Sequence, residues 1–230
     1  MVLKILKTVW PVMLTYVAIG APCGMIMAQA GMEPWMVFAL SSTFVTGCGQ
    51  FMVCNLWLAG VPAASIVASV AAISSRFALY SASIAPHLAG ASKRQTLAVA
   101  ATLTEEAYGI SLAKLIEGQD WGPRESFALN VILIATWGVS CTMGAVVGAV
   151  VDVPTALAGF VCTSLFICLL FSQRLSRGNA VAAVLAAASV AVCKFLGWTN
   201  VAVPVSVLVG VAVALVCDAL AEGRGARDAR

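Results

Sequence analysis

Apolar runs of membrane-spanning length follow one another through most of this chain, and they limit its fold more than any other feature. A helix needs about 20 mostly apolar residues to cross a bilayer, whereas membrane-barrel strands alternate in polarity and are about 9–11 residues long. Runs of the helical kind, joined by short turns, occupy residues 9–30, 35–59, 61–84, 95–116, 126–151, 155–171, 180–195 and 201–220. The sequence therefore predicts an all-α, polytopic membrane helix bundle of about seven or eight transmembrane helices.

The composition supports a chain surrounded by lipid. Apolar residues make up 61% of the sequence and charged residues 10%, against about half and about a quarter in soluble domains. The net charge is +3 and no lysine–arginine cluster is present, so the chain lacks the basic surface that a nucleic-acid partner requires. We predict a single transmembrane domain over residues 1–220, followed by a polar, disordered tail over residues 221–230.

Cysteine and histidine usage gives no sign of a metal site or a cofactor. The eight cysteines lie inside apolar runs without a CxxC pair, and we interpret them as small hydrophobic residues. The only histidine, His87, follows Pro86 at the end of the third run. It is either a proton-relay group or, as we favour, an interfacial residue.

The basic residues predict the orientation of the chain, with one conflict. Lys4 and Lys7 place the N-terminus in the cytoplasm by the positive-inside rule. With eight full spans, however, Lys93 and Arg94 would lie outside. This conflict predicts that one early segment is re-entrant or broken, which would leave seven true spans.

Two early runs carry residues that interrupt helices. The first contains Gly20, Pro22 and Gly24 within the sequence GAPCG, and the second contains Gly47 within GCGQ, followed by the polar Gln50. Proline removes a backbone donor, and transporters use broken helices to direct half-helix termini at a substrate. We predict breaks at both places; the alternative is that the glycines are helix-packing contacts.

Ionisable residues lie deep inside the third and fourth runs, where charge is costly and usually functional. Arg76 and Tyr80 are four residues apart, so they share a helix face, and Ser74 adds a hydroxyl nearby. Glu105 and Glu106 lie between apolar stretches of the fourth run. We predict that Arg76 pairs with one glutamate, while the other is a candidate proton carrier. A purely structural ion pair, or a fourth segment lying partly at the surface, are the alternatives.

The order of these motifs resembles that of the AzlC family, the large subunit of bacterial branched-chain amino-acid exporters. The resemblance extends from about Trp10 to the last helix and is strongest before Tyr108. Its motifs are GAPCG at 20–24, FVTGCGQF at 44–51, SSRFALY at 74–80, APHL at 85–88 and TEEAY at 104–108. The chain departs from the usual family residues at Ser74 (asparagine), Thr46 (alanine) and Glu105 (aspartate), next to the expected cavity.

The resemblance implies a transporter of the bacterial cytoplasmic membrane that exports hydrophobic amino acids, driven by the proton gradient. It also implies a small membrane partner of the AzlD type. On the residues, we place an amino-acid substrate at Arg76, Tyr80, Gln50, Ser74, Gly24 and Gly47, with Glu105 and Glu106 in proton coupling or ion pairing.

Rival interpretations are a passive channel, an exporter of another small molecule, an intramembrane enzyme and a non-transporting scaffold assembled through small-residue faces such as Gly144 and Gly148. An enzyme is disfavoured because the sequence has no histidine cluster and no HExxH motif, and the missing P-loop argues against ATP hydrolysis by this chain. A homo-oligomer is compatible with the sequence.

Overall fold

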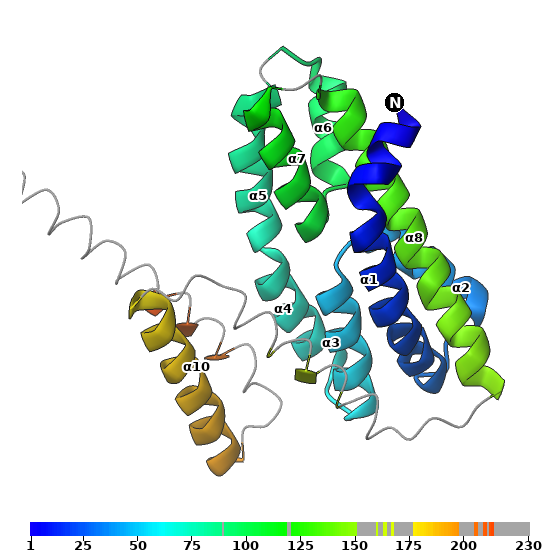
Figure 1. The fold of residues 1–230 in the computed structure, drawn as a ribbon. Helices are drawn as coiled ribbons and strands as arrows, with labels where there is room; N and C mark the ends of the chain where they lie inside the picture. The colour runs from blue at the N-terminus through cyan, green and yellow to red at the C-terminus, as the bar shows by residue number, and fades with distance from the viewer. Residues whose placement is uncertain are drawn as a thin grey trace, which may run out of the picture. The chain divides into compact units, whose positions relative to one another are not determined.

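The computed structural model describes residues 1–88, 90–118, 121–150 and 177–197, with isolated positions at 160, 163–164, 167, 205–206, 209–210 and 212–213. Within these residues the regular structure is helical throughout (Figure 1), which confirms the all-α prediction. The runs expected at 155–171 and 201–220 fall almost wholly outside the described residues, as does the tail at 221–230.

The chain divides into two compact units, one of Met1–Leu58 with Ser74–Cys162 and one of Ala59–Ile73 with Thr163–Arg230. The second unit holds most of α4 (Ala63–Ser74) and the helix α10 (Arg177–Phe195), which agrees with the run expected at 180–195. The first unit holds the remaining helices named below. The prediction of one domain over residues 1–220 stays a prediction.

Two long helices, α1 (Val2–Gln29) and α8 (Pro123–Val150), form the central helix pair of the first unit (Figure 1). At 28 residues each, both are long enough to cross a bilayer. Each supplies two glycines at the contact, and the pairs are Gly20 with Ser140, Gly24 with Cys141, Gly144 with Ala21, and Gly148 with Met25. Because the paired numbers rise together, the two helices run in parallel.

The predicted break of the first run at GAPCG is wrong, because α1 is continuous through Pro22. A Cβ atom on Gly24 would overlap the carbonyl of Cys141, so the glycine is a close helix-packing contact, as the alternative held. Pro22 removes only one backbone hydrogen bond, which membrane helices tolerate when neighbouring helices pack around them. Gly144 and Gly148 likewise pack against α1 of the same chain.

The second run is a re-entrant helical hairpin. It consists of α2 (Pro34–Thr43), a break at residues 44–46 and α3 (Gly47–Leu58), so the predicted break near Gly47 is confirmed. In Figure 1, α3 turns back toward the end of the unit where α1 finishes. This break agrees with the prediction that one early segment is re-entrant or broken.

The fourth run is a second hairpin, where the sequence predicted one full span. It follows α5 (Arg76–Ile84) and the short 3-10 helix η1 (Ala85–Leu88), and it consists of α6 (Lys93–Ala101) and α7 (Glu105–Glu117). Residues from η1, the start of α6, the end of α7 and the start of α8 line one common pocket. Both ends of this hairpin thus lie at the same end of the unit, and its tip at residues 102–104 points inward.

The two hairpins are built alike and enter from opposite ends of the unit (Figure 1). At each tip a threonine caps the second helix: Thr46 Oγ1 accepts a hydrogen bond from Gly49 N at 3.2 Å, and Thr104 Oγ1 accepts one from Ala107 N at 3.2 Å. Each hairpin also follows a long apolar helix, α1 or the 26-residue stretch Ala63–Leu88.

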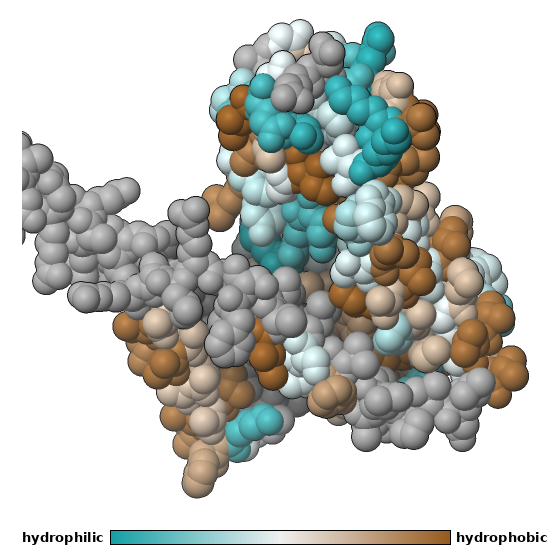
Figure 2. Space-filling view, viewed as in Figure 1, coloured by the Kyte–Doolittle hydropathy of each residue, from teal (hydrophilic) through white to brown (hydrophobic). Residues whose placement is uncertain are grey.

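Basic residues gather at one end of the first unit, visible as teal in Figure 2. Lys4 and Lys7 lie at the start of α1, Lys93 and Arg94 at the start of α6, and Arg124 at the start of α8. Lys4 lies 6.0 Å from the ring of Trp121, which joins the starts of α1 and α8. Lys93 and Arg94 thus lie at the same end of the unit as Lys4 and Lys7, which removes the conflict with the positive-inside rule. Among the described residues, Val2–Gln29, Ala63–Leu88 and Pro123–Val150 are apolar and long enough to span a membrane.

Candidate functional site

An ion pair joins Arg76 and Glu105 within the apolar helices of the first unit. Arg76 is the first residue of α5 and Glu105 the first residue of α7, and the guanidinium Nη2 contacts the carboxylate Oε1. The side chains are 30% and 21% exposed, so water reaches them only partly. This confirms that Arg76 pairs with one of the two glutamates, which leaves Glu106 as the second carboxylate.

Two buried polar atoms beside this ion pair have no hydrogen-bond partner in the described part of the chain. They are the hydroxyl of Ser74, at the end of α4, and the Nε atom of Arg76. An unsatisfied buried donor is costly, so such atoms indicate a place where water or a ligand binds. Arg76 therefore has a donor left over for an anion after it has neutralised Glu105.

Glu106 has different partners from Glu105. The hydroxyl of Tyr16, halfway along α1, donates to Glu106 Oε2 at 2.6 Å and lies 3.3 Å from Thr104 Oγ1. The tyrosine ring is buried, whereas Glu106 is exposed. The second carboxylate is thus anchored by a neutral hydroxyl and open on its other side.

Asn130 of α8 holds the break between α6 and α7. Its Nδ2 atom donates to the carbonyl of Val99 at 3.1 Å and to Thr102 Oγ1 at 3.0 Å. In lipid, backbone groups freed at a break need such partners. The fully buried amide of Asn130 therefore explains why the fourth run breaks here without glycine or proline at the break.

The tip of the first hairpin is organised by Gln50. Its Oε1 atom accepts from Ser41 Oγ at 3.1 Å and from the indole nitrogen of Trp137 at 3.0 Å, and its Nε2 atom donates to the carbonyl of Phe44 at 2.6 Å. A Cβ atom on Gly47 would lie 3.0 Å from the Trp137 ring. Gln50 therefore satisfies the backbone freed at this break, and Gly47 lets α3 approach the indole.

Aromatic contacts join the two tips. The rings of Tyr16 and Trp137 meet edge to face with centroids 5.3 Å apart, so one chain of contacts runs from Gln50 through Trp137 and Tyr16 to Glu106. On the other side of α7, Tyr80 stacks on Tyr108 at 4.6 Å. The predicted face of Arg76 and Tyr80 thus lies along α7.

The structure gathers five of the predicted residues, Ser74, Arg76, Tyr80, Glu105 and Glu106, around the start of α7. Gln50 and Gly47 lie at the other tip. Gly24 lies inside the continuous helix α1, against α8, so it provides no half-helix terminus. Sequence reasoning missed four residues that organise the site: Tyr16, Thr104, Asn130 and Trp137.

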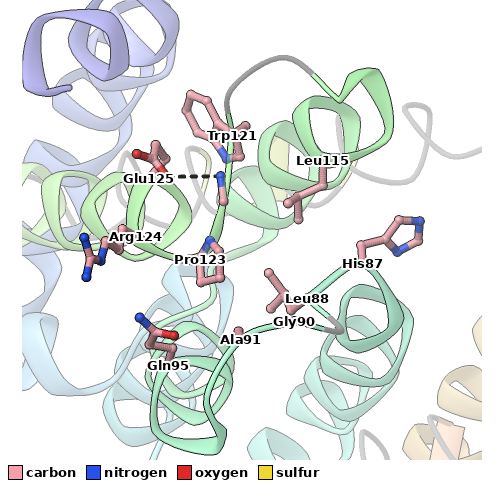
Figure 3. A pocket seen from close by; sticks show the side chains of 11 residues that line it. His87, Leu88, Gly90, Ala91, Gln95, Leu115, Trp121, Pro123, Arg124 and Glu125 are labelled. Carbon is pink, nitrogen blue, oxygen red and sulfur yellow. Dashed lines mark hydrogen bonds between the residues drawn. The ribbon is translucent and has the colours of Figure 1, made fainter.

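A pocket of about 420 Å³ opens at the basic end, away from this site (Figure 3). Apolar side chains such as Leu88, Leu115 and Pro123 face its middle, whereas His87 and Arg124 point away from it. His87 is exposed, which fits an interfacial residue. The pocket lies between the base of the second hairpin and the start of α8.

Long apolar helices, two re-entrant hairpins and charges at the hairpin tips define a polytopic membrane protein of the transporter type. The chain matches the AzlC protein family over residues 11–151, from α1 through both hairpins to the end of α8. This match covers more than half of the chain, so the protein belongs to the AzlC family. No curated protein and no solved structure matches it.

Proposed function

We propose that this chain is the large subunit of a proton-coupled secondary transporter that exports hydrophobic, branched-chain-type amino acids. The observation that carries the proposal is the charged group at the tip of the second hairpin. It places Arg76 and two carboxylates within apolar helices, where ionisable residues usually mark a substrate or ion pathway.

The chemistry of this group suits a zwitterion. The free Nε atom of Arg76 and the hydroxyl of Ser74 are donors for a substrate carboxylate. A carboxylate of the pair at the start of α7 is an acceptor for the ammonium group or for a proton. Tyr80 lies beside α7 through its stacking on Tyr108, and Gln50 is joined to Glu106 through Trp137 and Tyr16. A hydrophobic side chain would then lie among the apolar faces of the helices.

Membership of the AzlC family supports a proposal for the location and the partner as well. We place the protein in the bacterial cytoplasmic membrane with the basic end, and hence the N-terminus, in the cytoplasm. Its partner would be a small AzlD-like membrane subunit. A passive channel is the second candidate, because a partly hydrated ion pair also suits a solute-conducting path.

Efflux from cells loaded with hydrophobic dipeptides tests the proposal. The cells express this chain, the small subunit, both or neither, and isoleucine, valine, leucine and methionine are followed in the medium. We expect export only with both chains, and loss of export with an uncoupler. Export that runs only down the gradient and ignores the uncoupler would favour the channel. No export of any of the four would overturn the branched-chain assignment.

A further inference from the structure

Tyr16 is the residue outside the predicted site that contacts the charged group most closely. Its hydroxyl lies 2.6 Å from Glu106 Oε2, and its ring is held edge to face against Trp137. Trp137 is fixed in turn by its hydrogen bond to Gln50. The tyrosine hydroxyl therefore has a defined position on the rigid pair of α1 and α8, and it orients the Glu106 carboxylate from there.

The two glutamates at the start of α7 differ in their counter-ions. Glu105 has Arg76, whereas the printed partners of Glu106 are neutral, and the salt bridges of the described residues are Arg76–Glu105 and Lys114–Glu117. The α7 N-terminus offsets part of the charge. A carboxylate at this depth without a full counter-ion attracts a mobile cation.

Within the described part of the chain, Glu106 forms no salt bridge with a lysine or arginine. The titratable and charged groups that the described contacts connect to it are Tyr16 of α1, Cys48 of α3 through Tyr16, and the adjacent Glu105 with its partner Arg76 of α5. From α8, the polar contacts to this region come from the neutral side chains of Asn130 and Trp137. The open side of Glu106 is thus free to take a ligand cation.

We infer that Glu106, oriented by Tyr16, is the ammonium subsite of this transporter, and that Tyr16 is its positioning residue. This inference rests on the proposed function and divides its site: Arg76 with Ser74 receives the carboxylate, and Glu106 receives the ammonium group. A proton and the ammonium group compete for one carboxylate, so each leaves as the other binds. Because only one of the two occupies Glu106 at a time, this single residue couples amino-acid export to proton uptake.

Binding to the purified complex of this chain and its small subunit tests the inference. The probes are leucine, its 2-oxo acid, which has no ammonium group, and 3-methylbutylamine, which has no carboxylate. The variant Tyr16→Phe removes only the hydroxyl, and Tyr108→Phe is the matched control because it removes the tyrosine hydroxyl that bonds Ser83 at 3.0 Å instead.

We expect Tyr16→Phe to weaken leucine and amine binding by about tenfold or more and to change 2-oxo acid binding by less than twofold. It should raise KM for leucine with little change in kcat, and Tyr108→Phe should leave all three affinities unchanged. An equal loss for leucine and its 2-oxo acid would overturn the ammonium subsite and leave the exporter intact. Amine binding that depends on Tyr16 in a complex that transports no amino acid would overturn the proposed function and leave the subsite.

Discussion

At the scale of residues, the site depends on which charge each carboxylate meets. Glu105 is neutralised by Arg76, and Glu106 is held by a hydroxyl. Removing one partner of an ion pair leaves the other without its counter-ion, which costs more than removing both. The contribution of the Arg76–Glu105 ion pair to stability and its contribution to transport can therefore be measured separately.

The first prediction concerns Arg76. We expect Arg76→Ala to abolish export and to lower stability by about 1–3 kcal/mol, because it leaves the Glu105 charge unpaired. The double variant Arg76→Ala/Glu105→Ala should regain most of the stability but none of the export. Efflux assays and thermal unfolding of the purified protein measure the two effects. Export retained in the single variant would remove Arg76 from the site.

The residues of the site were only partly predictable from the sequence. Charge inside an apolar run is a strong signal, so the pairing of Arg76 with a neighbouring glutamate was foreseen. Tyr16 and Trp137 gave no such signal, since aromatic residues in apolar runs also face lipid. Asn130 was the one polar amide in the fifth run, and that contrast was the available clue to its role.

At the scale of elements, the helix breaks decide where the site forms. Glycine and proline wrongly predicted a break in α1, where Gly20 and Gly24 pack against α8, whereas glycine correctly predicted the break in the second run. The break in the fourth run has neither residue; its sequence signal is TLTEEA, a threonine cap followed by acidic residues, which marks a helix start. Within an apolar run, such a capping sequence is as good a signal of a helix break as glycine is.

The shared threonine caps give the second prediction. We expect Thr46→Val and Thr104→Val each to destabilise the protein by about 0.5–2 kcal/mol, because each leaves an N-terminal amide without its acceptor. Thr43→Val is the control, since Thr43 Oγ1 bonds the carbonyls of Ala39 and Leu40 within its own helix. Thermal unfolding in detergent measures the three variants. If the two variants lost very different amounts of stability, the two hairpin tips would not be capped in an equivalent way.

The packing of α1 on α8 gives the third prediction. Gly24→Ala should cost about 1–3 kcal/mol or more, because its Cβ meets the backbone of α8. Gly109→Ala, in α7, is the matched control: nothing lies within 4 Å of its Cβ position, and alanine favours a helix by up to about 1 kcal/mol. Thermal unfolding of both variants decides the matter, and a harmless Gly24→Ala would show that α1 and α8 do not pack this closely.

At the scale of the whole molecule, the two hairpins set the membrane topology. With re-entrant hairpins, the segment before α6 lies on the same side as the N-terminus, whereas eight alternating spans put it on the other side. The positive-inside conflict in the sequence already indicated this outcome for one segment. It gave no indication that two segments turn back.

Thiol labelling of intact cells checks this topology. An impermeant reagent should label Glu33→Cys from outside, but Gly90→Cys only after the cells are permeabilised. The wild-type protein corrects for the native cysteines, of which the five described are buried. Gly90 suits the experiment because its Cβ position is open. Labelling of Gly90→Cys from outside would contradict the re-entrant arrangement of α2 and α3.

The most direct test of the central claim is transport by the purified two-subunit complex in proteoliposomes. A pH gradient is imposed, and movement of labelled leucine is compared for the wild-type chain and Arg76→Ala. We predict leucine movement opposite to the proton flow, collapsing with a protonophore and absent in the variant. Leucine movement that is indifferent to the pH gradient, or equal in the variant, would contradict a proton-coupled exporter built around the charged tip of the second hairpin.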